Sequence, residues 1–203
     1  RVLEPVLQTH PDTGSPGGGT VTLGYRCVGS GMTIAAACRH GIAGTAAVVF
    51  DTDLAGDRAA TTIRFDTAPG DTVTLTKYVA YHSSSQVPDA AGDVSIEELA
   101  TRCSGTLDLA EAAGWERALA DQQAWLDLFW TRTDIAVDGD DAAQQAIRWN
   151  LFQMAQASAQ IGGRGIAAKA VTAGGYDGHY FWDTEVYMVP LLAYTNPTAA
   201  RDL

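Results

Sequence analysis

Basic residues are scarce in this sequence of 203 residues, which has 13 Lys and Arg against 24 Asp and Glu and a formal net charge of −11. The few basic residues are scattered along the chain rather than clustered. Nucleic acids and anionic membrane surfaces attract proteins through clustered positive charge, so we expect neither as a partner. The sequence also lacks a run of about 18 apolar residues, which a membrane-spanning helix needs.

Cysteine is also rare, with only Cys27, Cys38 and Cys103 in the chain. Three cysteines cannot all pair with one another, and none lies in a CxxC motif that would indicate a zinc or redox site. We therefore expect buried thiols and a reducing, cytoplasmic compartment. An initiator Met and a signal peptide are lacking as well, so we expect the chain to be a piece of a longer protein, cut at both ends.

Apolar and polar residues alternate between Thr20 and about His82, as at Val21, Leu23 and Tyr25. This period of two predicts β-strands. Three clusters of turn-forming residues separate the runs: Gly29-Ser30-Gly31, Ala55-Gly56-Asp57 and Pro69-Gly70-Asp71. Such turns predict that consecutive strands run antiparallel, as in part of a β-sandwich. Residues 11–19, which are rich in Gly, Pro and Ser, are predicted to form a loop.

Helical spacing replaces the alternation near residue 95. The stretch Ser95-Ile96-Glu97-Glu98 has the capping-box pattern of a helix start. Apolar residues then recur at steps of three and four along residues 115–129, although Gln122 interrupts the stripe. Two further helices are predicted, over residues 142–159 after the cap Asp138-Gly139-Asp140-Asp141, and over residues 182–194 before Asn196-Pro197, with Pro190 as a site of kinking.

The densest mixture of aromatic and polar side chains is the segment 174–185, which reads GGYDGHYFWDTE. Sugars suit this mixture, because their C–H faces pack on aromatic rings and their hydroxyl groups bind carboxylates. The alternative is an ordinary helix start, at which Phe181 and Trp182 pack in a core and Asp183 and Glu185 favour the helix dipole.

Two other chemistries are weaker at this segment. His179 and Asp183 are four residues apart with Asp177 close by, but no other His or Cys cluster accompanies them, so we expect no metal. Asp183 and Glu185 cannot serve as the acid and base of a glycosidase, because residues two apart on a helix point about 200° apart around its axis.

The same segment closely resembles glycoside hydrolase family 65, the inverting disaccharide phosphorylases that include maltose, trehalose and kojibiose phosphorylase. The resemblance rests on residues 175–185, on Tyr194-Thr195-Asn196-Pro197 and on Ile166-Ala167-Ala168-Lys169. Residues 138–153 resemble the first barrel helix of the family, and residues 72–84 resemble a late strand of its N-terminal sandwich. Residues 170–174 read AVTAG where the family more usually has GLTGE, which leaves the preference for the acceptor sugar open.

The resemblance implies a fold class: a multidomain α and β protein with part of an antiparallel β-sandwich, linker helices and the first helices of an (α/α)6 barrel. We place the end of the sandwich domain at residues 1–94 and the helical linker at residues 95–137. Residues 138–203 are then the incomplete start of the catalytic barrel.

The resemblance also assigns substrate-binding residues. Trp182 and Asp183 match the family residues that hold the glucosyl unit to be transferred, and Tyr176, His179 and Phe181 are expected to support or line that subsite. We expect Trp182 and Asp183 to face inward together, as one wall of a glucose pocket.

The reaction implied by the resemblance is phosphorolysis of an α-linked glucose disaccharide, in which phosphate is a co-substrate and no cofactor is needed. A Glu protonates the glycosidic oxygen while phosphate attacks the anomeric carbon from the opposite face, giving glucose 1-phosphate and a free sugar. In the family that Glu and the phosphate-binding loop lie farther along the chain, so we identify no catalytic residue here and expect this piece alone to be inactive.

The expected partners are the substrates, the rest of the parent chain and a second copy in a homodimer. Two alternatives stay open: a hydrolase of the same family, such as an acid trehalase, and a non-catalytic sugar-binding relative.

Overall fold

The computed structural model describes residues 3–9, 19–45, 47–84, 94–158, 165–169, 176 and 179–203. They belong to two compact units that divide between Ala118 and Leu119, and each is described by itself. The division lies inside the predicted linker, whose boundaries stay a prediction.

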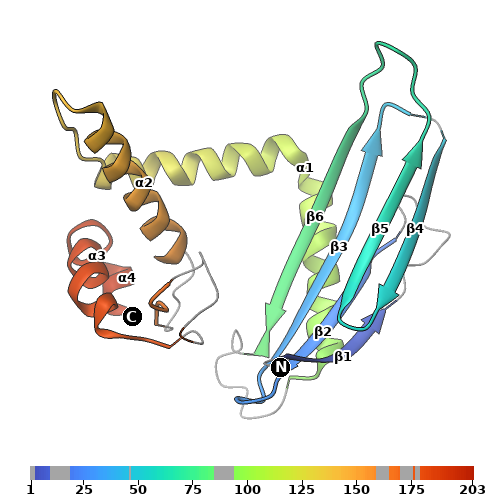
Figure 1. The fold of residues 1–203 in the computed structure, drawn as a ribbon, viewed down its shortest axis with the longest axis horizontal. Helices are drawn as coiled ribbons and strands as arrows, with labels where there is room; N and C mark the ends of the chain where they lie inside the picture. The colour runs from blue at the N-terminus through green and yellow to red at the C-terminus, as the bar shows by residue number, and fades with distance from the viewer. Residues whose placement is uncertain are drawn as a thin grey trace. The chain divides into compact units, whose positions relative to one another are not determined.

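The first unit contains β1 (Leu3–Thr9), β2 (Val21–Cys27), β3 (Thr33–Ala43), β4 (Val48–Ala55), β5 (Arg58–Phe65), β6 (Thr74–Ser83) and the start of α1 (Ile96–Thr133) (Figure 1). The second contains the end of α1, α2 (Asp141–Ser158), the π-helical turn η4 (Thr184–Met188), α3 (Val189–Thr195) and α4 (Pro197–Arg201).

The strands form two antiparallel sheets, one in the order β1-β2-β3-β6 and one made of β4 and β5. The predicted turn clusters lie between β2 and β3, between β4 and β5, and before β6. Gly31 and Gly56 have φ angles of 74° and 62° in the first two turns, a conformation that glycine adopts without steric cost. The prediction of antiparallel sandwich sheets followed by helices is confirmed. The loop predicted at residues 11–19 lies outside the described residues, apart from Gly19.

Strand β1 is not among the predicted strands, because Pro5 interrupts the alternation. Proline has no N–H to donate to a ladder, so within sheets it occurs at edges and bulges. Strand β1 has both features: it is the edge of the four-stranded sheet, and its register shifts between Pro5 and Leu7.

Helix α1 begins where its cap predicts. The hydroxyl of Ser95 accepts a hydrogen bond from the N–H of Glu98 at 3.1 Å, and the first helical residue is Ile96. The carboxylate of Glu98 forms an ion pair with Arg102 at 2.6 Å, one turn farther along.

The core of the first unit lies between the start of α1 and the four-stranded sheet (Figure 1). Three side chains of the helix and three alanines of the sheet are at most 3% exposed: Leu99, Cys103, Leu107, Ala35, Ala37 and Ala80. The small alanine side chains let the helix approach the sheet closely. Burial of these apolar groups is the main force that holds the helix on the sheet.

The prediction of buried thiols is right for Cys103 and wrong for Cys27 and Cys38, which are partly exposed. Cys27 is the last residue of β2, next to an exposed turn, so little of the chain covers it. The thiol of Cys103 donates to the carbonyl of Ala35 at 3.4 Å, and burial raises its pKa.

Helix α1 is kinked at Gly114, which has a φ of 78° and a ψ of 171°. Beyond the kink the predicted apolar stripe is helical, but much of it is exposed. Trp115 is 61% exposed, Leu119 42%, Trp125 42% and Leu128 51%. The described residues therefore leave this face of the helix largely uncovered. None of the helices in the described ranges combines the length and the hydropathy needed to cross a bilayer.

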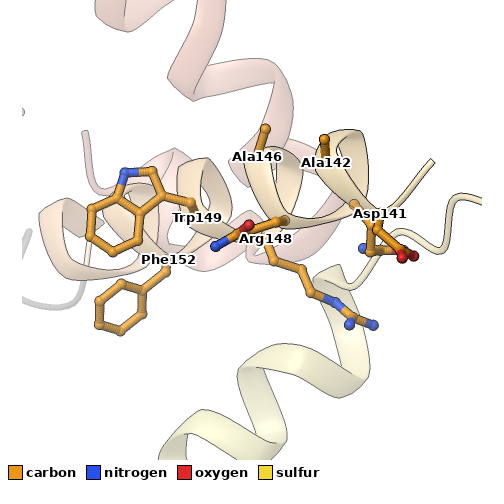
Figure 2. A pocket seen from close by; sticks show the side chains of 8 residues that line it. Asp141, Ala142, Ala146, Arg148, Trp149 and Phe152 are labelled. Carbon is orange, nitrogen blue, oxygen red and sulfur yellow. The ribbon is translucent and has the colours of Figure 1, made fainter.

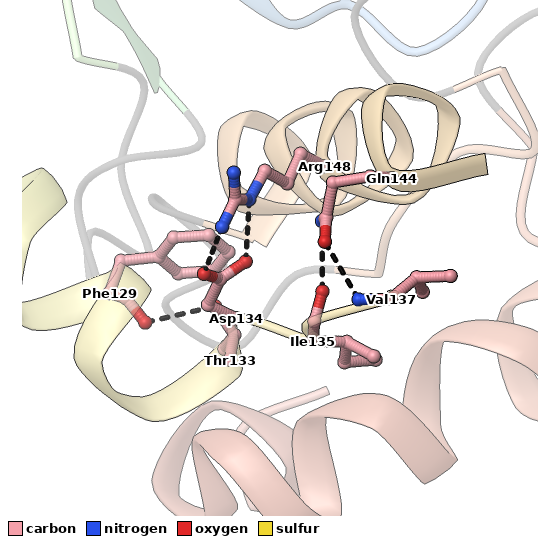
Figure 3. Close-up of polar contacts among 7 residues, drawn as sticks. All are labelled: Phe129, Thr133, Asp134, Ile135, Val137, Gln144 and Arg148. Atoms are coloured by element: carbon pink, nitrogen blue, oxygen red, sulfur yellow. Dashed lines mark hydrogen bonds and ion pairs between the residues drawn. The ribbon is translucent and has the colours of Figure 1, made fainter. Parts of the chain in front are cut away.

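Two side chains of α2 hold the connection between α1 and α2 (Figure 3). The guanidinium of Arg148 donates to both carboxylate oxygens of Asp134, at 2.8 and 2.6 Å. The Gln144 amide donates to the carbonyl of Ile135 at 2.9 Å and accepts the N–H of Val137 at 2.8 Å. Since a bidentate Arg–carboxylate pair fixes both distance and orientation, it sets how α2 follows the connection.

The N-terminus of α2 is capped as the sequence predicts. Asp140 accepts the N–H of Ala143 at 2.9 Å, and Gly139 has a φ of 84° in the turn before it. Leu151 and Ala155 are the buried residues of α2.

A methyl group at Gly24 is expected to destabilise the first unit. An added Cβ would lie 2.6 Å from Cγ1 of Ile96 and 2.8 Å from Cβ of Leu7, so one of these must move. Overpacking of this kind costs about 1–3 kcal/mol. Urea unfolding of the full-length parent should therefore show an earlier transition for Gly24→Ala than for Gly29→Ala, whose Cβ would meet nothing within 4 Å. Equal transitions for the two variants would show that this packing is wrong.

The ion pair of Asp134 and Arg148 predicts a pH-dependent contribution to stability. Hydrogen bonds from Arg148 lower the pKa of Asp134 in the folded state, so the contribution is present above the ordinary Asp pKa of about 3.9 and is lost as the pH falls through the lowered value. Asp134→Asn should lower the melting temperature at pH 7, and its difference from the wild type should disappear at strongly acidic pH.

The control for this prediction is a double-mutant cycle with Arg148→Met. The double variant should be no less stable than either single variant, because the pair is lost only once. Additive losses would mean that the two side chains stabilise the protein independently.

Candidate functional site

The residues predicted to bind sugar lie around the start of a helix in the second unit. This helix begins at Trp182, passes through the π-helical turn η4 and continues as α3 to Thr195. The π turn ends directly before α3, in which Pro190 lies, and the N–H of Val189 donates to the carbonyl of Thr184 in it. The kink predicted at Pro190 stays a prediction. Asn196 ends α3, as predicted, but its side chain also caps a further helix, α4, by accepting the N–H of Ala199. Single π turns inside helices are frequent at functional sites.

Two of the five predicted residues, Phe181 and His179, each contact a third, Tyr176. The rings of Tyr176 and Phe181 meet edge to face, with centroids 5.3 Å apart. The backbone N–H of His179 donates to the carbonyl of Tyr176 at 2.9 Å. Tyr176 itself has a φ of 53°, in the left-handed region that bulky side chains seldom adopt. Tyr176 and Phe181 therefore form an aromatic cluster, which His179 contacts through its backbone.

Trp182 and Asp183 follow this cluster directly in the chain, and both are exposed. The side chain of Trp182 is 81% exposed, and that of Phe181 is 39% exposed. The expectation that Trp182 and Asp183 face inward as one wall of a pocket is therefore wrong for the described part of the chain, because no second wall covers the indole there. The alternative of an ordinary core helix start is not met either, since an exposed indole is not packed in a core.

Tyr180 and Glu185 form a polar contact beside these residues. The Tyr180 hydroxyl donates to Oε1 of Glu185 at 2.6 Å, and this hydrogen bond, together with burial and the negative charge, raises the pKa of Tyr180. Glu185 is thus engaged as an acceptor, which agrees with a supporting rather than a catalytic role.

The segment upstream of the cluster lies against it. The N–H of Ala168 donates to the carbonyl of His179 at 3.3 Å, and Nζ of Lys169 lies 5.7 Å from the ring centroid of Tyr176. A cation at this distance from a tyrosine ring is attracted to its face. Much of the intervening chain, including the atypical residues 170–174, lies outside the described residues.

A metal site finds no support among the residues that the structure describes. Within those ranges no group of three or more His, Cys, Asp and Glu side chains lies close enough to hold an ion. Asp177, which belonged to the metal alternative, is outside them.

A second aromatic surface lies along α2. It is an open hollow of about 700 Å³ lined by Asp141, Ala142, Gln144, Gln145, Ala146, Arg148, Trp149 and Phe152. Figure 2 shows the rings of Trp149 and Phe152 side by side, and their centroids are 6.3 Å apart. Two of its polar groups, Arg148 and Gln144, are already bonded to the connection before α2. The hollow therefore offers mainly an apolar contact.

Two residues that hold the candidate site, Tyr180 and Thr184, are not among the predicted site residues. Both lie within the motif, but the sequence does not show that Tyr180 packs on Gly165 or that Thr184 is buried. Thr184 is 2% exposed and donates to the carbonyl of Ile166 at 2.9 Å, a partner 18 residues away.

The sequence matches two family profiles. The profile of the N-terminal domain of glycosyl hydrolase family 65 matches residues 1–129. The profile of the central catalytic domain of the same family matches residues 148–203.

The chain is also similar to characterised and uncharacterised relatives. An uncharacterized glycosyl hydrolase of Mycobacterium tuberculosis is 39% identical over 89% of this chain and 22% of its own length. Two proteins of Thermoanaerobacter brockii are similar as well. An alpha,alpha-trehalose phosphorylase is 36% identical over 66% of this chain and 16% of its own length. A kojibiose phosphorylase is 30% identical over 73% of this chain and 18% of its own length. The chain thus spans about a fifth of the length of these curated relatives.

A solved structure has the same fold. It is a putative kojibiose phosphorylase from the human microbiome, with a TM-score of 0.77 and 24% sequence identity over 100% of this chain and 25% of its own. The two family profiles match most of the sequence, on both sides of the connection between α1 and α2. The chain therefore belongs to glycosyl hydrolase family 65 and contains parts of its N-terminal and central catalytic domains.

Proposed function

We propose that this chain is part of an inverting disaccharide phosphorylase, which cleaves an α-linked glucose disaccharide with inorganic phosphate. The observation that carries the proposal is the helix start at which an exposed indole, Trp182, is followed directly by an exposed carboxylate, Asp183. Relatives that are named trehalose and kojibiose phosphorylases support the choice of reaction.

In this proposal Trp182 and Asp183 bind the glucosyl unit that is transferred. The indole face packs on the apolar C–H face of the pyranose ring, and the carboxylate accepts hydrogen bonds from its hydroxyl groups. Tyr176, which contacts both His179 and Phe181, supports this subsite together with them from the preceding turn.

The chemistry requires one protein acid. A phosphate oxygen forms a bond to the anomeric carbon while the bond from that carbon to the glycosidic oxygen breaks, and the acid gives its proton to the leaving oxygen. The products are glucose 1-phosphate with inverted configuration and a free sugar. Phosphorylases of this family use phosphate as the co-substrate and need no cofactor. We assign the acid and the phosphate-binding loop to a part of the parent protein outside these residues, so this piece alone should be inactive.

The same proposal covers the surroundings of the site. The relatives are about four times as long as this chain, and the second unit exposes Trp149, Trp182, Tyr187 and Tyr194 by 61%, 81%, 66% and 92%. Large apolar surfaces of this kind are normally covered. We assign the covering of these side chains to the remaining helices of an (α/α)6 barrel. We also propose that the parent protein is cytoplasmic and forms a homodimer.

A hydrolase of the same family is the second candidate. Three mycobacterial relatives are named only as glycosyl hydrolases, and water would replace phosphate as the nucleophile in such an enzyme. A protein that binds sugar without turnover ranks third.

Activity of the full-length parent protein separates these candidates. We expect cleavage of α-linked glucose disaccharides with phosphate and none without it. Trp182→Ala and Asp183→Asn should each lower kcat/KM by at least about 100-fold, because each removes a contact to the transferred ring. Trp115→Ala, which also removes an exposed indole, should leave the rate unchanged.

Three results would count against the proposal. Cleavage without phosphate would identify a hydrolase, and binding of the disaccharide without any turnover would identify a non-catalytic relative. Full activity of Trp182→Ala would move the glucosyl subsite elsewhere in the protein.

A further inference from the structure

Thr184 follows Asp183 directly and is buried in an otherwise exposed stretch. Within residues 179–187 all side chains except that of Thr184 are exposed, whereas Thr184 is only 2% exposed. A buried side chain that is packed on its surroundings restricts the backbone that carries it, and exposed side chains do so much less. The position of this helix start therefore depends on Thr184.

The hydroxyl of Thr184 donates a hydrogen bond to the backbone carbonyl of Ile166 at 2.9 Å. Ile166 is 5% exposed and packs with Leu192 in the small core of the second unit. The bond thus joins the helix start to a segment that apolar packing already holds. Since the bond is buried, removing the donor leaves the carbonyl without its partner.

Two further contacts fasten the same two segments together, and a third braces the helix start itself. The ring of Tyr180 lies against Gly165, where an added Cβ would be 2.5 Å from the ring. The N–H of Ala168 donates to the carbonyl of His179, and the hydroxyl of Tyr180 donates to Glu185 within the helix-start segment. All of them lie nearer to solvent than the bond of Thr184.

The backbone of Thr184 transmits its position to the residues on both sides. Its N–H donates to the carbonyl of Phe181 at 3.1 Å, and its carbonyl accepts the N–H of Val189 to close the π turn. Trp182 and Asp183 are the two residues between Phe181 and Thr184. A shift of Thr184 must therefore move both of them.

We propose that Thr184 is a positioning residue of the glucosyl subsite, whose buried hydroxyl bond to Ile166 holds Trp182 and Asp183 where they meet the sugar. The proposal rests on the proposed function. It assigns no contact between Thr184 and the substrate. Because a displacement of about 1 Å can cost about 100-fold in rate, the loss of one buried hydroxyl should be visible in catalysis.

The experiment replaces Thr184 by the nearly isosteric valine in the full-length enzyme and compares it with a matched control. Thr133 is also a buried threonine, at 6% exposure, and its hydroxyl donates to the carbonyl of Phe129 at 2.9 Å. We expect Thr184→Val to raise KM for the disaccharide and lower kcat/KM by about 10- to 100-fold, with KM for phosphate unchanged. Thr184→Ser, which keeps the hydroxyl, should restore both values. Thr133→Val should lower the melting temperature by a similar amount and leave both KM values unchanged.

Two results would overturn the proposal: a Thr184→Val enzyme with the same KM for the disaccharide as Thr133→Val, or a Thr184→Ser enzyme as impaired as the valine variant. If Thr184→Val does not fold, Gly165→Ala replaces it. The added methyl group displaces Tyr180 and should likewise raise KM for the disaccharide, and an unchanged KM overturns the proposal. If the wild type proves to cleave without phosphate, the proposed reaction is wrong, and the same comparison on hydrolysis tests Thr184 independently.

Discussion

The candidate site depends on the buried hydrogen bond between the hydroxyl of Thr184 and the carbonyl of Ile166. It connects the helix start to the contact of Ile166 with Leu192. The side chains around it are exposed, so they can meet a ligand but hold little of the backbone in place. A protein that presents polar and aromatic groups to solvent needs such an anchor, because a binding site must keep its geometry within fractions of an ångström.

The two units differ in how far they bury their apolar residues. In the first, the start of α1 covers the alanines of the sheet almost completely. In the second, the buried apolar residues are few, and aromatic rings on α2 and on the helix after Trp182 remain exposed. Both units nevertheless expose apolar side chains among the described residues, including Val49, Leu75 and Tyr81 in the first.

Features set by neighbouring residues could be predicted from the sequence, and features set by distant ones could not. Alternation predicted the antiparallel strands, and Ser95 and Asp140 predicted two helix starts, because each acts within a few residues. Strand β1 was not predictable from alternation, since Pro5 is tolerated only at an edge or bulge, which is a property of the whole sheet. The burial of Thr184 depends on Ile166, 18 residues earlier, and the exposure of Trp182 depends on which helices surround it. The family resemblance supplied the candidate residues, but neither their exposure nor their anchor.

The most direct test of the account is a crystal structure of the full-length protein with a bound glucose disaccharide. We predict a glucosyl ring stacked on the indole of Trp182, with a sugar hydroxyl within hydrogen-bonding distance of Asp183 and the Thr184–Ile166 bond intact beneath them. A disaccharide bound elsewhere, with Trp182 packed against protein alone, would contradict it.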